Sequence, residues 1–401
     1  MKKIFNQFGP GVLVTAAFIG PGTVTVCTLA GNDHQLNLLW VMGFAIASTI
    51  VLQEMSLRLG LITQKGLAVN IRGQIHSRWL KSLAMVLIFS SIVIGNLAYE
   101  AGNISGSALG LSYVLMDIKQ DYYSWYAIGV GVLSSWLVFS GNYKIIERVL
   151  IGLVGIMSFV FIFAALLSGP KITELLTGLF RPSFPKDSFY TIMGLIGTTI
   201  VPYNLFLHAS MISSKWKTAD ALPAARKDNF AAIVLGGIIS SSIIICGAAG
   251  NGGAGNLAEV MKPALGSAAY PLMGMGLFTA GLTSAITAPL AAVLVARECF
   301  NWENSLLSNK SRGIGALVIF TGTIISVVGY KPIDIIRFAQ ALNAILLPVV
   351  AGFLIWMMNQ NSFPLKYRNN IWNNVLGILV LGVTLMISLR SFEKIFNLHL
   401  F

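Results

Sequence analysis

Hydroxyl and amide side chains gather around two proline-centred segments that interrupt long apolar stretches. The first segment reads Gly20-Pro21-Gly22-Thr23, and the second reads Thr198-Thr199-Ile200-Val201-Pro202-Tyr203-Asn204. Proline has no amide proton and clashes with the preceding turn, so a helix breaks there and its backbone groups are freed. Inside lipid such a break is tolerated only where those groups meet protein, water or a ligand. Paired breaks in two halves of a chain therefore predict a shared binding site for a small solute at mid-membrane.

The elements that must position these breaks are membrane helices. Of the 401 residues 55% are hydrophobic and 10% charged, and the mean hydropathy is +0.76, values that do not suit a soluble globular protein. We expect an all-α polytopic membrane protein, a single transmembrane domain over residues 1–401. About eleven spans, each near the ~20 residues that cross a bilayer, are predicted at 9–29, 36–60, 82–111, 123–140, 148–168, 190–213, 229–249, 269–297, 313–330, 333–358 and 371–391.

The charges indicate an orientation and exclude several functions. Most of the 27 Lys and Arg residues fall in alternate connecting segments. Because positive charge is retained on the cytoplasmic side, we expect the N-terminus in the cytoplasm and, after an odd number of spans, the C-terminus outside a plasma (inner) membrane. The net charge of +12 then needs no nucleic-acid partner. Cys27, Cys246 and Cys299 show no paired ligand spacing, so neither a disulfide nor a zinc site is expected.

The position of the two breaks predicts an internal repeat. If spans one to five and six to ten are repeats, Pro21 and Pro202 hold equivalent places in the leading helix of each. An odd number of spans per repeat forces opposite topology, which is an inverted repeat. The first repeat covers about 9–168, the second about 190–358, and 371–391 is an extra helix.

Several short motifs lie at the breaks and near the ends of the spans. They read Gly9-Pro10-Gly11 before the first span, Pro21-Gly22 in its break, Leu52-Gln53, Arg58-Leu59-Gly60 and Gly66-Leu67-Ala68 at the end of the second, Pro202, Asn204 and Leu207-His208 in the sixth, Ala280-Gly281, Ser284 and Ile286-Thr287 in the eighth, and Gln340 with Leu347-Pro348 in the tenth. In these motifs the sequence resembles the NRAMP (natural-resistance-associated macrophage protein) divalent-metal transporters over nearly the whole chain. The resemblance implies the LeuT-like fold of amino acid/polyamine/organocation transporters, a five-plus-five inverted repeat with broken helices one and six and alternating access around them.

The chain departs from that family at its metal ligands. The family's first break reads Asp-Pro-Gly-Asn, where this chain has Gly20 and Thr23. In the sixth span the family's alanine carbonyl, methionine sulfur and histidine are matched by Thr198, Val201 and Tyr203. The Asp-Leu-Ala-Glu of the family's proton route reads Asn96-Leu97-Ala98-Tyr99. Since divalent cations are held by carboxylates, imidazoles or thiolates, we expect no transition-metal site and no other cofactor.

The groups that remain at the breaks suit a small oxyanion. The N-terminus of a half-helix offers unpaired N–H groups and the positive end of its dipole. Bicarbonate is the favoured substrate, and the resemblance extends to NRAMP-related bicarbonate carriers that lack the metal motif; nitrite, formate, acetate or a small zwitterion fit nearly as well. The predicted substrate-binding residues are Gly20, Gly22, Thr23, Thr198, Thr199, Val201, Tyr203, Asn204 and Gln340, with the hydroxyl of Thr25 nearby.

An anion entering a cell that is negative inside needs a driving ion, because each elementary charge costs about 2.3 kcal/mol per 100 mV. In the LeuT-like fold, sodium joins carbonyls of the first break to hydroxyls of the eighth span. The resemblance therefore implies sodium as coupling ion, bound by Ala17, Gly20, Thr283, Ser284 and Thr287. Hydroxyls on spans rich in small residues also serve as packing hydrogen bonds, so both roles stay open.

Two titratable residues are candidates for coupling. Glu100 follows the family's acidic position by one place, and His208 lies six residues beyond Pro202. For each of them a structural role is the alternative. Glu54 and Arg58, four residues apart, are expected to form a structural ion pair.

The sequence thus predicts a monomeric secondary transporter in the lipid bilayer, with sodium-coupled uptake of a small inorganic oxyanion. The alternative is a proton-coupled importer of divalent manganese, iron or magnesium of the NRAMP type. A non-transporting sensor is a third reading. An enzyme is not expected, since no nucleophile–base pair or metal triad is found.

Overall fold

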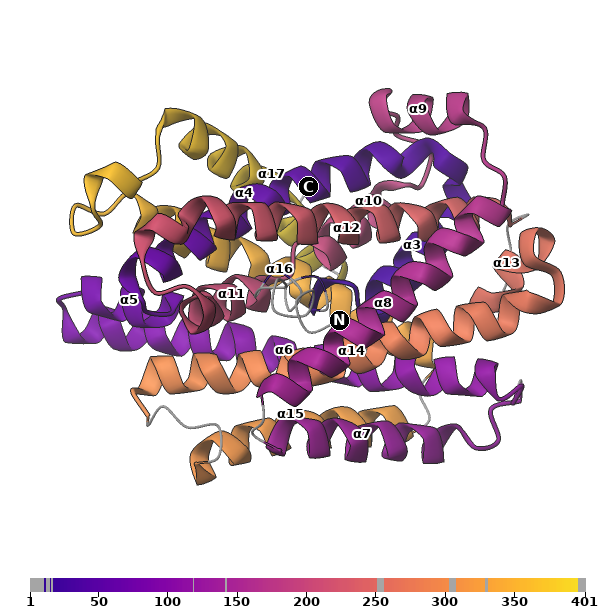
Figure 1. Cartoon of the computed structure of the whole chain (residues 1–401), viewed down its shortest axis with the longest axis horizontal. Coiled ribbons are helices and arrows are strands. Elements are labelled where there is room, and N and C mark those ends of the chain that lie inside the picture. Colours follow the sequence, from indigo (N-terminus) through magenta and orange to yellow (C-terminus); the bar gives the residue numbers. More distant parts are fainter. Residues whose placement is uncertain are drawn as a thin grey trace.

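Two interrupted helices run through a bundle of long helices (Figure 1). The computed structural model describes residues 11, 15, 17–117, 119–140, 143–250, 256–302, 308–328 and 331–395, except for the side chains of 143, 144, 214, 337, 340–345, 387 and 390–395. Its helices are α3 (Pro21–His34), η1 (Gln35–Leu38), α4 (Leu39–Thr63), α5 (Leu67–Gln74), α6 (Arg78–Val114), α7 (Tyr123–Phe139), α8 (Tyr143–Leu167), α9 (Ile172–Phe180), α10 (Phe189–Thr199), α11 (Pro202–Lys215), η2 (Ala219–Ala221), α12 (Leu222–Ala248), α13 (Leu257–Leu265), η3 (Gly266–Ala268), α14 (Ala269–Phe300), α15 (Asn309–Val327), α16 (Pro332–Met358), η4 (Leu365–Tyr367) and α17 (Ile371–Ile395).

The helices follow the predicted spans in order. Seven helical stretches of the described chain are long and apolar enough to cross a membrane, and three shorter apolar helices lie at 123–139, 346–358 and 371–386. Several helices continue beyond the predicted spans, as α6 does at both ends. Hydropathy marks only the part of a helix inside hydrocarbon, whereas the protruding turns carry charged residues such as Arg78 and Lys81. The connections also contain α5, α9 and α13, which are too short to span a bilayer.

Two helix stretches form the centre of the bundle. In α10–α11 and in the stretch that contains α14, 94% of the most apolar window is buried. Helix α6 packs along α14 and reaches the first break, where a Cβ on Gly106 would overlap the ring of Pro21. Small residues of this kind let helix backbones approach closely in a membrane. The two breaks are therefore enclosed by α6 and α14.

The start of the first span is tied to α12. The backbone N–H of Gly11 donates to Asp228 Oδ2 at 2.9 Å, and Thr15 Oγ1 donates to the carbonyl of Ala232 at 2.8 Å. These bonds hold the first half of the broken helix against the bundle.

The predicted ion pair of Glu54 and Arg58 is confirmed, with Arg58 Nη2 at 3.0 Å from Glu54 Oε2. The same buried guanidinium donates to the carbonyls of Tyr367 and Arg368 at 2.8 and 3.0 Å. Arg58 therefore fastens α4 to the segment that leads into α17.

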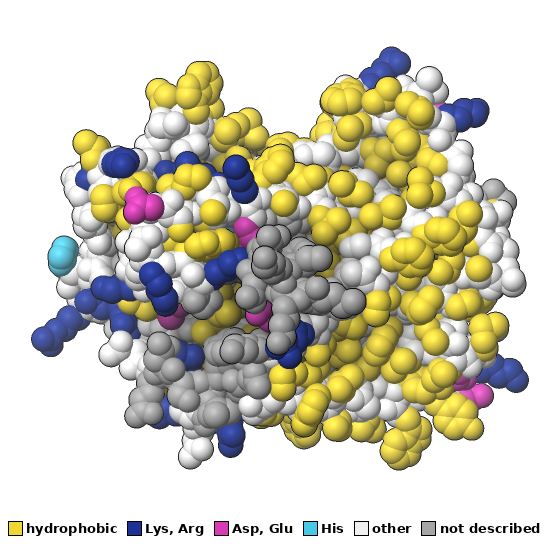
Figure 2. Space-filling model, viewed as in Figure 1, with side chains coloured by type: hydrophobic (Ala, Val, Ile, Leu, Met, Phe, Trp, Pro, Cys, Tyr) yellow, Lys and Arg dark blue, Asp and Glu magenta, His cyan; other side chains and the backbone are white. Residues whose placement is uncertain are grey.

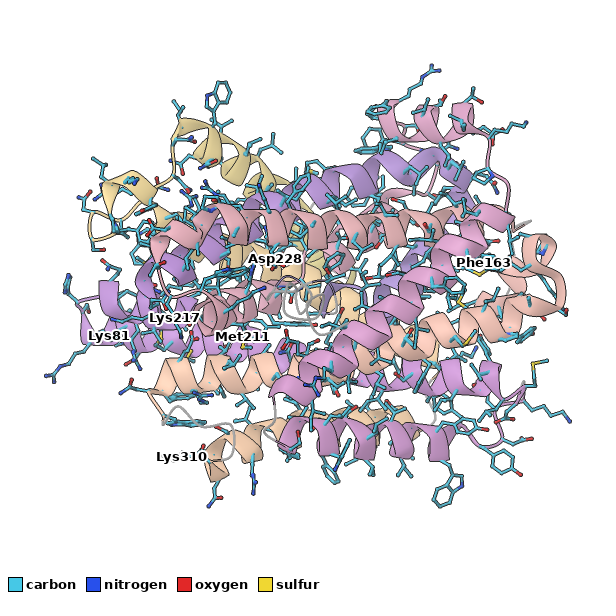
Figure 3. The ribbon with its side chains drawn as sticks, viewed as in Figure 1. Lys81, Phe163, Met211, Lys217, Asp228 and Lys310 are labelled. Atoms are coloured by element: carbon cyan, nitrogen blue, oxygen red, sulfur yellow. The ribbon has the colours of Figure 1, made fainter. Side chains whose placement is uncertain are left out.

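Basic side chains gather mostly at one end of the molecule, and hydrophobic side chains cover much of the remaining surface (Figure 2). Lys81, Lys217 and Lys310, from three separate segments, all lie at that end (Figure 3). This arrangement agrees with basic residues in alternate connections. Which side of the membrane this end faces remains a prediction from the positive charge.

Candidate functional site

Both predicted breaks lie where proline begins a new helix. In the first span Ala17 and Phe18 are helical, Ile19 and Gly20 bend away, and α3 begins at Pro21. In the sixth, α10 ends at Thr199, Ile200 and Val201 are extended (ψ 83° and 120°), and α11 begins at Pro202. Each half-helix thus opens with proline at its first position, where the missing N–H would have no partner in any case. The N-terminal ends of α3 and α11 therefore both lie at the breaks.

One hydroxyl chain joins the two breaks. Thr23 Oγ1 donates to the carbonyl of Phe18 at 2.7 Å and lies 2.9 Å from Thr198 Oγ1. A hydroxyl has a single proton, which Thr23 gives to the carbonyl, so Thr198 is the donor in the second bond. Both threonines are fully buried. The pair of side chains thereby connects α3 with α10 across the site.

Uncharged side chains occupy the space beside Gly20, the position at which the NRAMP family has a carboxylate. A Cβ on Gly20 would lie 2.8 Å from Ser284 Oγ and 3.1 Å from the Tyr99 hydroxyl. The backbone of Gly20 has φ −100° and ψ −178°, which any residue can adopt. The close neighbours of Gly20, and not its backbone conformation, therefore oppose a side chain here, because the hydroxyls of Ser284 and Tyr99 would have to move.

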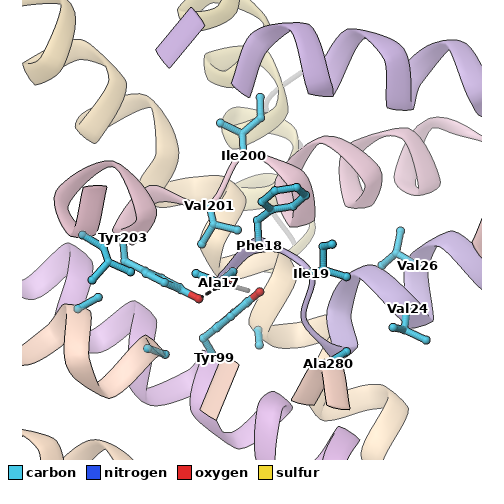
Figure 4. Packing of buried hydrophobic residues seen from close by; sticks show 14 of the residues in the cluster. Ala17, Phe18, Ile19, Val24, Val26, Tyr99, Ile200, Val201, Tyr203 and Ala280 are labelled. Atoms are coloured by element: carbon cyan, nitrogen blue, oxygen red, sulfur yellow. Dashed lines mark hydrogen bonds between the residues drawn. The ribbon is translucent and has the colours of Figure 1, made fainter. Parts of the chain in front are cut away.

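Two tyrosines line the site beside Gly20. The Tyr203 hydroxyl donates to the carbonyl of Ala17 at 2.8 Å, and the rings of Tyr99 and Tyr203 meet edge to face with centroids 5.6 Å apart (Figure 4). Sequence reasoning did not place Tyr99 at the site. Tyr99 lies three residues after Asn96, so the two side chains share one face of α6. This spacing could have indicated that Tyr99 faces the centre of the bundle if Asn96 does. Asn96 Nδ2 donates to the carbonyl of Ala288 in α14, at 2.9 Å.

The other predicted substrate residues differ in their surroundings. Gly22, Val201 and Asn204 are buried at the starts of α3 and α11. The Thr199 hydroxyl donates to the carbonyl of Leu195 at 2.7 Å, within its own helix. The side chain of Gln340 lies outside the described residues. Thr25 Oγ1 is buried and has no hydrogen-bond partner in the part of the chain that the structure describes.

The predicted sodium residues also differ in their bonding. Thr283 Oγ1 donates to the carbonyl of Ala280 at 2.8 Å, and Thr287 Oγ1 to that of Ser284 at 3.4 Å, as packing hydroxyls do. Ser284 Oγ is buried and has no hydrogen-bond partner among the described residues. The carbonyl of Ala17 accepts the Tyr203 bond.

Each coupling candidate is hydrogen-bonded to a residue outside the breaks. Glu100 accepts from Asn103 Nδ2 at 3.2 Å and packs against Gly322 of α15. One residue is about 100° of rotation on a helix, which turns Glu100 away from the face of Tyr99. His208 Nδ1 lies 2.9 Å from Gln53 Oε1 of α4 and donates to that oxygen.

Within the described residues no group of three His, Cys, Asp or Glu side chains could hold a metal ion. The groups at the breaks are hydroxyls, backbone amides and carbonyls. They can donate and accept hydrogen bonds and can coordinate a hard monovalent cation, but they carry no formal charge.

A bundle of apolar helices with two interrupted helices meeting at its centre defines a secondary transporter of the LeuT-like fold. The chain belongs to the family described as natural resistance-associated macrophage protein-like, which matches residues 11–392. It is accordingly an integral membrane transporter and not an enzyme.

Two curated relatives are both named divalent metal cation transporter MntH. That of Erwinia tasmaniensis is 26% identical over 357 residues, 85% of this chain and 83% of the relative. That of Aeromonas hydrophila subsp. hydrophila is 23% identical over 406 residues, 98% and 96% of the two chains.

Solved structures share the fold. The manganese transporter of Eremococcus coleocola superposes with a TM-score of 0.78 at 19% identity, covering 98% of this chain and 87% of its own. MhsT in complex with L-phenylalanine gives a TM-score of 0.62 at 18% identity, with coverage of 96% and 97%. The predicted fold class is confirmed by these similarities.

Proposed function

We propose that this chain is a sodium-coupled importer of a small monovalent oxyanion, with bicarbonate as the favoured substrate. The observation that carries the proposal is the environment of Gly20. Neutral hydroxyls of Ser284 and Tyr99 face this position so closely that any side chain there would have to displace them, and neither supplies negative charge. A divalent cation in a low-dielectric site would lack the negative charge that offsets its desolvation.

The N-termini of α3 and α11 support an anion at the breaks. The first-turn N–H groups of a helix have no intrahelical acceptor and add to the positive end of its dipole. In α3 these include the N–H groups of Gly22 and Thr23. A bound oxyanion would accept hydrogen bonds from these N–H groups.

The buried hydroxyl of Ser284 supports sodium as the coupling ion. A buried polar atom without a partner is destabilising unless a ligand or water satisfies it. Ser284 Oγ borders Gly20, so a cation there would adjoin the carbonyls of the first break. Sodium moving with the anion would also cancel the charge carried against the membrane potential.

Divalent-metal transport is the second candidate, and the names of the relatives favour it. In that case carbonyls and hydroxyls alone would have to bind the metal. We further propose that the transporter is a monomer with its N-terminus in the cytoplasm and its C-terminus outside.

Uptake into proteoliposomes tests the proposal. Radiolabelled bicarbonate is supplied at fixed pH with and without an inward sodium gradient, and manganese and magnesium are added as competitors. The proposal predicts sodium-driven accumulation that neither metal inhibits. Equal uptake with and without the gradient would remove sodium coupling, and no uptake above that of empty liposomes would overturn the anion assignment.

A further inference from the structure

The third span contributes a buried aromatic side chain to the breaks. Tyr99 lies in α6 and is 1% exposed, and its hydroxyl would lie 3.1 Å from a Cβ on Gly20. Figure 4 shows Tyr99 and Tyr203 pointing toward the Ala17 segment from two different helices. The ring of Tyr99 therefore stands at the wall of the site.

The ring of Tyr99 is supported by Tyr203, which is itself held in place. Tyr203 is fixed by its bond to the carbonyl of Ala17 at 2.8 Å. The ring of Tyr99 meets it at an interplanar angle of 65°, the edge-to-face arrangement that aromatic rings prefer. The ring of Tyr99 therefore cannot move toward Tyr203 without displacing a side chain that a hydrogen bond holds in place.

We propose that Tyr99 is the residue that limits substrate size in this transporter: its ring, braced by Tyr203, admits anions the size of bicarbonate and excludes longer carboxylates. This inference rests on the proposed function, because it concerns the same site. Removal of the ring together with its hydroxyl opens the site toward α6.

Competition against radiolabelled bicarbonate measures the size limit. Formate, acetate, propionate and butyrate are compared as inhibitors of sodium-driven uptake in proteoliposomes that contain the wild type, Tyr99→Phe, Tyr99→Leu or Tyr99→Ala. An extra methylene is discriminated by about tenfold or more in a closely fitting pocket. We expect propionate and butyrate to inhibit the Ala variant at about tenfold lower concentration than the wild type, with formate little changed and the Leu variant intermediate. Tyr99→Phe keeps the ring and removes only the hydroxyl beside Gly20, so it should widen the limit less than Tyr99→Leu does.

Tyr113 provides the matched control. It lies in the same helix, is 2% exposed, and meets Tyr270 edge to face with centroids 5.6 Å apart. Tyr113→Ala therefore removes an equivalent buried ring from α6 at a place away from the breaks. It should leave the order of inhibition unchanged.

Three results would overturn the inference. They are an unchanged size limit in both Tyr99→Leu and Tyr99→Ala, an equal widening in Tyr113→Ala, or a limit widened as far in Tyr99→Phe as in Tyr99→Ala. In each of these cases bicarbonate uptake by the wild type still stands, so the proposed function survives. A wild type that carries no bicarbonate refutes the proposed function instead, and the size-limit inference with it.

Discussion

Replacement of Gly20 by alanine adds one methyl group where the site has no room. The new Cβ would lie 2.8 Å from Ser284 Oγ, 3.1 Å from the Tyr99 hydroxyl and 3.4 Å from Ser284 Cβ. Overpacking of a buried site by a methyl group costs typically about 1–3 kcal/mol. The backbone at position 20 suits alanine, so the whole loss comes from these contacts.

The closest contact can be removed separately. Ser284→Ala deletes the oxygen at 2.8 Å and leaves the carbon at 3.4 Å, an ordinary van der Waals distance. Residues in contact are expected to couple by about 0.5–3 kcal/mol. Gly20→Ala should therefore be less destabilising in the Ser284→Ala background than in the wild type.

Unfolding of purified protein in detergent, followed by heat or denaturant, measures both effects. Gly129→Ala in α7 is the control, because a Cβ there meets nothing within 4 Å. We expect the control to be neutral or slightly stabilising, as Gly-to-Ala changes at open positions are. A Gly20→Ala protein as stable as the wild type, or a loss that Ser284→Ala does not reduce, would refute the packing described around Gly20.

Three further predictions concern individual contacts in the structure. Thr198→Val removes the donor to Thr23 and should raise the bicarbonate concentration for half-maximal uptake about two- to tenfold. Unchanged uptake kinetics in both Thr198→Val and Thr23→Ala would show that neither threonine belongs to the site. Ser284→Ala should raise the sodium requirement more than the bicarbonate requirement, and equal shifts would count against a sodium role. In Gly66→Ala the new Cβ would overlap Glu298 Oε1 and displace that carboxylate from the first turn of α5. We expect the free energy of unfolding to fall by about 1–3 kcal/mol, and Glu298→Ala should partly reverse this loss. A Gly66→Ala protein as stable as the wild type would contradict this contact.

The breaks and the spans could be predicted because their causes are local. Proline interrupts a helix wherever it lies, and a run of apolar residues long enough to cross a bilayer needs no partner to be recognised. Helices α5, α9 and α13 could not be predicted in this way, since they are too short for that signal.

The internal bonding of the site could not be predicted from composition. The sequence supplied the hydroxyls of Thr23, Thr199 and Tyr203 as donors for a ligand, but each donates to a backbone carbonyl in the structure. Only the fold decides which carbonyls come within reach. The same holds for Tyr99 and Glu100, neighbours in sequence that face different helices.

Manganese and bicarbonate fluxes measured in parallel in one proteoliposome preparation test the central claim most directly. The claim is that this protein of the NRAMP fold carries an anion and not a divalent metal, because Gly20 has no charged side chain and uncharged hydroxyls occupy the space beside it. The account predicts sodium-driven bicarbonate uptake and no manganese entry above that of empty liposomes, with or without a proton gradient. Proton-driven manganese uptake without bicarbonate flux would contradict it and establish that neutral oxygens bind the metal.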